Sequence, residues 1–369
     1  MTTTLVATLC APGPPTPGWL VLGDGVIVDM GAGAVAAGPD IVDLGDALLV
    51  PGLLDLQVNG VGEVDFARAD GAAWQRARAA LVRGGTTGFC PTLVSAALDS
   101  YEPWLTEVAA IAADDDGAAI LGVHLEGPFL GGAPGAHPVE LLRPAEPVWL
   151  EKLLDAVPGL VRIVTLAPEA DPDLFATRLL AGRAVVVALG HSTASYDDVM
   201  AAADAGASVV THLFNGMGPF HQRAPGLIGA ALSDPRLTPT IIADLVHVHP
   251  AALRLAIAAK DSLGLVTDAV AVGTAIADTA RPDQDGVPRL ADGTLVGSTL
   301  TLDRAVRNVV GLGVPVARAV EMATAVPADV LGLRDRGRLA PGARADLVAL
   351  DPTTLEVRAV WLEGEQVVG

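Results

Sequence analysis

Seven polar side chains, five of them suited to acid, base or metal chemistry and two of them amides, each stand at or just past the end of a short apolar run. They are Gln57, Asn59, Glu126, His191, His212, His247 and Asp268. Carboxylate and imidazole groups bind divalent transition metals well, whereas neutral amides bind them poorly. If the runs are strands of one parallel sheet, their carboxyl ends lie on one edge and bring these seven side chains together.

Two histidines and one carboxylate form the best candidate metal site. Glu126 follows the third apolar run, His191 follows the fifth and His212 the sixth. With an open fourth position, this ligand set is typical of a catalytic zinc-type site. Such a metal activates water and polarises a carbonyl group. We therefore expect one divalent metal ion per chain, zinc or iron.

The first run ends in two amides, in the sequence LLDLQVNG, where many metal-dependent hydrolases carry a His-x-His pair. Gln57 and Asn59 are weak ligands for a transition metal, so a second tightly held ion is not expected. We predict that they orient water or the groups around the metal. Asp268 ends the last run, opposite the ligands, and can take a proton from water and give it to the leaving amine of an amide.

Each of these residues also has a structural interpretation, because polar residues commonly mark the ends of strands. Glu126 could be an exposed loop acid, and Asp268 an N-cap or turn acid. His191 and His212 could be hydrogen-bonded structural histidines. Seven candidates on one predicted rim favour the chemical interpretation.

The elements that must position these residues are eight short runs rich in β-branched residues or leucine, several of them followed by an alanine-rich helical stretch. A helix is predicted over 195–205, where Ser195 and Asp198 match a capping box and Gly206 ends the helix. Eight alternating strand and helix units predict a (β/α)8 barrel with its site at the carboxyl ends of the strands. The runs are 47–60, 85–95, 118–129, 161–169, 184–193, 207–217, 238–248 and 263–270.

The two ends of the chain have a different texture, with short strand patterns separated by Gly and Pro turns. We predict that residues 1–48 and 338–369 pair into one small β domain beside a barrel formed by residues 49–337.

Composition limits the partners and the compartment. The formal net charge is −20, which argues against nucleic acid and anionic membranes as partners. Two isolated cysteines, Cys10 and Cys90, indicate a reducing compartment. The N-terminal segment lacks a basic stretch followed by a long apolar one, and no run approaches the ~20 apolar residues of a membrane span. We therefore expect a cytoplasmic protein.

The ordered motifs resemble those of the N-acetylglucosamine-6-phosphate deacetylases, a branch of the amidohydrolase superfamily that itself has Gln-x-Asn in place of His-x-His. The resemblance covers nearly the whole chain and rests on PGLLDLQVNG, GTTGFCPTLVS, HLEGPFL, GHS, THLFNGM, IIADLVHV, LVTDA, GSTLTLDRAVRN and LAPGARADLVALD. It implies metal-dependent hydrolysis of the acetamide of N-acetyl-D-glucosamine 6-phosphate, which gives glucosamine 6-phosphate and acetate.

The resemblance also implies a role for individual residues near the metal. Glu126, His191 and His212 match the family's metal ligands, and Asp268 matches its general acid and base. His137, in the sequence GAHP, matches a histidine that contacts the sugar and helps to polarise the acetyl carbonyl.

Four further positions match residues that receive the phosphorylated sugar. Asn215, Gly216 and His247 match positions for the sugar and its phosphate. Arg223 matches an arginine that the family supplies to the phosphate from the neighbouring subunit, which implies a homodimer. Arg223 and His247 would provide local positive groups within an acidic protein.

Three positions depart from the family pattern: Leu245 stands where glycine is usual, Val270 where methionine is common, and Gly216 where alanine is usual. None belongs to the metal site or the proton carrier, so the departures bear on which sugar is preferred. The alternative function is deacylation of another N-acyl substrate, either a different N-acetyl amino-sugar phosphate or an N-acyl amino acid. A non-catalytic paralogue should lack a ligand or Asp268, and this chain retains all four residues.

Overall fold

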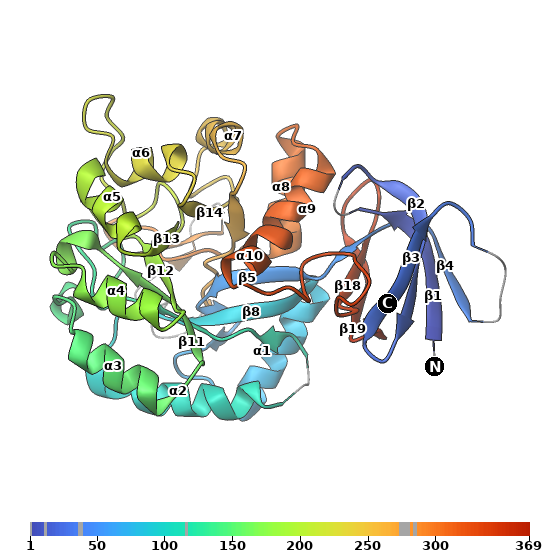
Figure 1. The fold of residues 1–369 in the computed structure, drawn as a ribbon, viewed down its shortest axis with the longest axis horizontal. Coiled ribbons are helices and arrows are strands. Elements are labelled where there is room, and N and C mark those ends of the chain that lie inside the picture. The colour runs from blue at the N-terminus through green and yellow to red at the C-terminus, as the bar shows by residue number, and fades with distance from the viewer. Residues whose placement is uncertain (1, 11–12, 36–39, 115–116, 273–280, 283–285) are drawn as a thin grey trace.

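Eight parallel strands form a nearly closed barrel, as the sequence predicts (Figure 1). The computed structural model describes residues 2–10, 13–35, 40–114, 117–272, 281–282 and 286–369. Each of the eight apolar runs supplies one barrel strand, and the short β9 (Ala119–Ile120) adds to the side of β8. In spatial order the barrel strands are β5 (Leu53–Val58), β8 (Thr86–Leu93), β10 (Val123–Glu126), β11 (Val161–Leu166), β12 (Val186–Leu189), β13 (Ala207–Val210), β14 (Thr238–Ile242) and β15 (Gly264–Val266).

The first and last barrel strands meet through hydrogen bonds at their carboxyl ends. The Asp268 main-chain N–H donates to the Gln57 carbonyl at 2.9 Å, and the Asn59 N–H donates to the Ala269 carbonyl at 2.7 Å. Beneath them the Thr267 hydroxyl donates to the buried Asp55 carboxylate at 2.6 Å. The join between β5 and β15 therefore lies directly under candidate site residues.

Helices follow most of the barrel strands, and each turns an apolar face to the barrel. In α8 the buried positions are Leu302, Ala305, Val306 and Val309, the spacing of one helical face. The predicted capping box of α5 is present, with Ser195 as N-cap and Asp198 bonded back to it. The helices are α1 (Gly71–Arg83), α2 (Leu98–Ala112), α3 (Pro147–Ala156), α4 (Phe175–Gly182), α5 (Tyr196–Asp204), α6 (Gly226–Ser233), α7 (Pro250–Ala259), α8 (Leu302–Gly311), α9 (Val316–Ala323) and α10 (Ala325–Val330), with the 3-10 turns η1 (Val139–Leu141) and η2 (Pro168–Ala170).

Both ends of the chain lie in one seven-stranded sheet beside the barrel, which confirms the predicted β domain from both termini (Figure 1). We call this the terminal sheet. Its strands in spatial order are β20 (Glu365–Val368), β19 (Val357–Leu362), β18 (Leu347–Leu350), β4 (Ile41–Pro51), β1 (Thr2–Leu9), β2 (Thr16–Gly23) and β3 (Val26–Ala32). The proposed boundary between residues 48 and 49 falls inside β4, which runs directly toward β5, so the three-part domain division stays a prediction.

Strands β4 and β18 take part in two hydrophobic cores at once. Because side chains alternate along a strand, Leu48 and Val50 pack into the barrel core while Leu49 packs into the core of the terminal sheet. In β18, Val348 belongs to the barrel core and Leu347 to the other.

Two small antiparallel strand pairs complete the described structure, β6 (Gly60–Val61) with β7 (Val64–Asp65) and β16 (Arg281–Pro282) with β17 (Pro288–Arg289). Among the described residues, every helix is too short or too polar to cross a lipid bilayer.

Candidate active site

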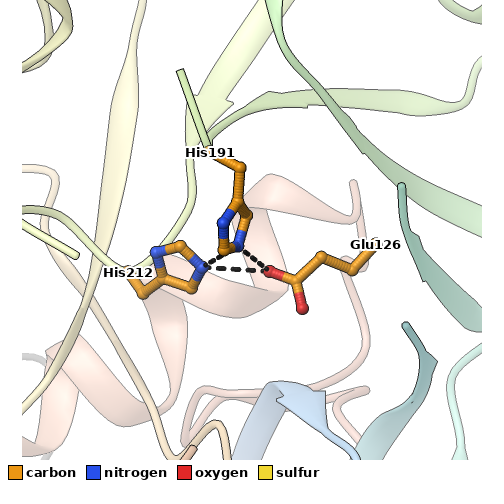
Figure 2. Close-up of side chains that lie close together, drawn as sticks. All are labelled: Glu126, His191 and His212. Carbon is orange, nitrogen blue, oxygen red and sulfur yellow. Dashed lines mark hydrogen bonds and ion pairs between the residues drawn. The ribbon is translucent and has the colours of Figure 1, made fainter. Parts of the chain in front are cut away.

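Glu126, His191 and His212 converge at the carboxyl end of the barrel (Figure 2). The Glu126 Oε1 atom lies 3.2 Å from His191 Nε2 and 3.0 Å from His212 Nε2, and the two nitrogens are 3.0 Å apart. All three residues are buried. The structure thus brings together the three residues predicted as metal ligands.

Three candidate residues leave their strands through the same backbone conformation. His191, His212 and Asp268 each stand two residues beyond a strand end, and their φ angles are 49°, 31° and 48°. Residues other than glycine rarely adopt positive φ, and such strained positions cluster at functional sites. Hydrogen bonds from main-chain N–H groups stabilise this conformation. One of them runs from the His212 N–H to the Thr240 hydroxyl, at 2.9 Å.

The donor atoms of this group fit a tetrahedral metal ion. Bonds of 2.0–2.1 Å at tetrahedral angles set neighbouring ligand atoms about 3.3 Å apart, and the observed separations are 3.0–3.2 Å. His191 Nδ1 lies 3.2 Å from the Ala133 carbonyl, as expected for a ligand whose second nitrogen donates outward. His212 Nδ1 is buried without a partner among the described residues.

Charge in the group also favours a cation. Burial acts to raise the pKa of Glu126, but the hydrogen bonds and positive charge of His191 and His212 outweigh it and leave that pKa well below its usual range. Burial acts to lower the pKa of His212, yet the Glu126 carboxylate raises it overall. Glu126 is therefore ionised, and its negative charge favours a cation beside it.

Gln57 and Asn59 direct their amide N–H groups at two carboxylates. Gln57 Nε2 donates to Glu126 Oε1 at 2.9 Å and to Asp268 Oδ1 at 3.3 Å, and Asn59 Nδ2 donates to Asp268 Oδ1 at 2.7 Å. The Thr211 hydroxyl donates to the side-chain oxygen of Gln57, Oε1, at 2.5 Å. The side-chain oxygen of Gln57 thus accepts a hydrogen bond, while its NH₂ group donates to two carboxylates.

Asp268 is poised between its acid and base forms. Burial, and then the negative charge of Glu126, raises the pKa of Asp268 to about 6. Both amide hydrogen bonds reach Oδ1 and leave Oδ2 available to take up a proton. A carboxyl group whose pKa lies near neutrality suits proton transfer in both directions.

A pocket of about 650 Å³ opens above these residues. His137 lines it from the loop after β10, with its Nε2 atom 3.8 Å from Glu126 Oε2. Burial lowers the pKa of His137 to about 3, so the ring is neutral. Asn215, Gly216 and His247 also line the pocket, as the resemblance implies.

His247 and Arg223 differ in their placement. Asp244 Oδ2 lies 2.6 Å from His247 Nδ1 and fixes the imidazole ring in the wall of the pocket. Arg223 lies on the exposed loop between β13 and α6, outside the described pocket lining.

Two of the three departures from the family pattern, Gly216 and Val270, line the pocket, and Leu245 stands two residues before His247. Gly216 has φ +58°, and a Cβ there would stand 2.7 Å from His191 Nδ1. Leu245 has φ 69°, a conformation that favours glycine. Val270 is buried in the pocket wall.

Several residues around the site escaped the sequence analysis. His124 bridges strands, with Nδ1 3.0 Å from the Leu56 carbonyl and Nε2 2.7 Å from the Thr165 hydroxyl, and burial lowers its pKa to about 4. Arg68 is the one arginine lining the described pocket. His124 stands two residues before Glu126 in the motif HLE, which was a usable signal for it. Nothing in the sequence near Arg68 marks that residue.

Glu169 joins the two loops that carry His137 and His191. Its Oε1 accepts from the main-chain N–H groups of Gly132 at 3.0 Å and Thr193 at 2.8 Å, and its Oε2 accepts from the Ser192 hydroxyl at 2.6 Å. We call this set of contacts the Glu169 clasp.

Glu169→Ala should weaken metal binding by about 10–100-fold, the usual effect of removing a group that orients a ligand. The clasp sets the loop bearing His191, and alanine leaves its three donors without their acceptor. Competition with a fluorescent chelator would measure the affinity. Glu140→Ala, which removes an exposed carboxylate from η1, is the matched control. Equal affinities in the two variants would show that the clasp does not orient the ligand.

The chain belongs to the amidohydrolase family, whose model matches residues 48–367. Barrel, terminal sheet and buried Glu-His-His group together agree with this class of hydrolases.

Several proteins similar to this chain are deacetylases of N-acetylated amino-sugar phosphates. N-acetylglucosamine-6-phosphate deacetylase from Bos taurus is 40% identical over 347 residues, which cover 88% of this chain and 84% of that protein. N-acetylgalactosamine-6-phosphate deacetylase from Escherichia coli is 39% identical over 371 residues, covering 94% and 95%. A solved structure of N-acetyl-D-glucosamine-6-phosphate deacetylase from Mycobacterium smegmatis, an aspartate-to-alanine variant in complex with N-acetyl-D-glucosamine-6-phosphate, has a TM-score of 0.93 and 38% identity and covers 100% of both chains.

Proposed function

We propose that this protein hydrolyses the acetamide of N-acetyl-D-glucosamine 6-phosphate to glucosamine 6-phosphate and acetate. The observation that carries the proposal is the Glu126, His191 and His212 group beside Asp268, at the floor of a pocket of about 650 Å³. Relatives that share about 40% of their residues over most of their length and carry this activity support it.

We assign the chemistry as follows. A divalent metal held by Glu126, His191 and His212 would lower the pKa of water and polarise the acetyl carbonyl. Asp268 Oδ2 takes a proton from the water that attacks the carbonyl carbon, while Asn59 and Gln57 hold Oδ1. As the C–N bond breaks, Asp268 returns that proton to the amine nitrogen.

His137 has a separate role in this proposal. Its neutral ring lies in the pocket wall close to Glu126. From this position it donates a hydrogen bond to the acetyl oxygen, where negative charge develops during attack.

Metal content and activity test the proposal together. We expect one tightly held equivalent of zinc or iron per chain by elemental analysis of protein purified without added metal, because both amides are engaged with carboxylates. Acetate should be released from N-acetyl-D-glucosamine 6-phosphate. Two equivalents would make Gln57 and Asn59 ligands, and metal-loaded protein without acetate release would refute the assignment.

A second substrate has specific support. The N-acetylgalactosamine-6-phosphate deacetylase covers more of this chain than the bovine glucosamine-type relative does, at nearly equal identity. Comparing kcat/KM for both sugar phosphates, and for an N-acetyl amino acid, would separate the proposed substrate from the alternatives.

We further propose that Arg223 reaches the substrate phosphate from a neighbouring subunit of a homodimer, with His247 contributing from the same chain. Arg223 is exposed and outside its own pocket lining, which suits a residue acting in trans. Cys10 and Cys90 are free and buried, which supports the proposed cytoplasmic location.

Arg223→Ala should raise KM for the phosphorylated sugar far more than for its unphosphorylated analogue, because a neutral side chain cannot replace a bidentate, charge-assisted contact. Arg76→Ala, which removes an exposed arginine of α1, is the control. An equal loss on both substrates would separate Arg223 from the phosphate. Arg68→Ala tests whether the arginine that lines the pocket of the same chain binds the phosphate instead.

A further inference from the structure

Ser95 contacts His137 at Nδ1, whereas the other ring nitrogen, Nε2, lies near Glu126. It follows β8 by two residues and is buried. Its hydroxyl oxygen is 2.9 Å from His137 Nδ1, and its main-chain N–H also points to that nitrogen, at 3.4 Å. Two groups of one residue therefore meet the same ring atom.

The main-chain contact shows which ring nitrogen carries the proton, although at 3.4 Å it is longer than the 2.9 Å hydroxyl contact. A main-chain N–H can only donate, and an imidazole nitrogen accepts only when it has no proton. His137 Nδ1 is the single acceptor for this N–H in the described part of the chain. Nδ1 is therefore the unprotonated nitrogen, the Ser95 hydroxyl also donates to it, and the proton of the neutral ring resides on Nε2.

The opposite nitrogen faces the chemistry. His137 Nε2 lies 3.8 Å from Glu126 Oε2, and the His137 and His191 rings are 4.4 Å apart between centroids. A proton on Nε2 thus makes a donor directed at the region beside the metal ligands, whereas a proton on Nδ1 would leave only an acceptor there.

The surroundings keep the Ser95 hydroxyl in place. Gly127 packs so closely that a Cβ at its position would stand 2.3 Å from Ser95 Oγ. The next residue, Ala96, donates its main-chain N–H to the Tyr101 hydroxyl at 3.2 Å. The loop is therefore anchored on both sides of the contact with His137.

We propose that Ser95 is a positioning residue, whose hydroxyl holds His137 in the Nε2–H tautomer so that this ring can donate to the acyl oxygen of the substrate. The link to the acyl oxygen rests on the function proposed above. The tautomer itself is a property of the protein alone.

Nitrogen NMR of zinc-loaded protein labelled in its histidines tests the proposal without substrate. The His137 signals, assigned from their loss in His137→Gln, should show a protonated Nε2 and an unprotonated Nδ1. A protonated Nδ1 in the wild-type protein would overturn the proposal, even if every Ser95 variant failed to fold. Because substrate is absent, this result is independent of whether amino-sugar phosphates are hydrolysed.

Substitution then tests the hydroxyl. Ser95→Ala leaves only the long 3.4 Å main-chain contact on Nδ1, so it should give a mixture of tautomers. It should lower kcat by about 10-fold at nearly unchanged KM, less than the ~10²–10³-fold typical of removing an oxyanion donor itself. Ser95→Thr keeps the hydroxyl and should restore both. Ser100→Ala is the matched control, since its hydroxyl bonds to the Ala97 carbonyl and not to His137. A wild-type tautomer in Ser95→Ala would refute the role of the hydroxyl.

Discussion

Asp268→Asn should retain its metal and still bind substrate, while kcat falls at least ~10²-fold. Asparagine keeps the shape of the side chain and one acceptor, so the hydrogen bonds from Asn59 and Gln57 to Oδ1 can persist. It cannot carry a proton from water to the leaving amine. Steady-state kinetics on N-acetyl-D-glucosamine 6-phosphate, combined with elemental analysis of the same sample, would measure both effects.

A more reactive substrate separates the two halves of this role. An N-trifluoroacetyl analogue has a more electrophilic carbonyl, so the variant should show a smaller defect on it if Asp268 helps water to attack. Near-normal kcat with the metal in place would mean that Asp268 is not the proton carrier. His137 would then be the next candidate.

The second large effect is expected for Glu126→Gln, which should lose the tightly held metal and at least ~10³-fold of activity, since a metal contributes several kcal/mol to such a reaction. Glu126 supplies the one anionic donor atom of the predicted ligand group. A neutral amide is a poor ligand for zinc or iron.

Metal removal and return give this prediction its control. Wild-type protein stripped by a chelator should lose activity and recover it with zinc, and zinc should raise its melting temperature because it binds the folded state. Glu126→Gln should gain neither activity nor stability from zinc. Glu140→Gln, at an exposed carboxylate, should behave as wild type. A zinc-dependent recovery of Glu126→Gln would remove Glu126 from the ligand set.

The barrel and the convergence of three candidate metal ligands were predictable because both follow from strand ends. Parallel strands bring their carboxyl ends together, so Glu126, His191 and His212 could be associated although 86 residues separate the first from the last. His137 lies in a long loop and was indicated only by the family resemblance.

Positioning residues were not predictable in the same way. Ser95 and His137 are 42 residues apart, and their contact depends on how two loops lie against each other. Glu169 gave no signal for a related reason, since its partners are main-chain N–H groups that any sequence possesses. Hydrophobic periodicity reports which face of an element is buried, and it carries no information about contacts between loops.

The alternation of Leu48, Leu49 and Val50 along β4 makes the terminal sheet inseparable from the barrel. Ending the chain before β18 would remove apolar side chains from both cores, since Leu347 and Val348 face opposite sides of the strand. The protein should therefore unfold in a single thermal transition, and neither the barrel nor the terminal sheet should fold when the other is removed. A fusion partner attached at either terminus extends from the terminal sheet rather than from the barrel (Figure 1).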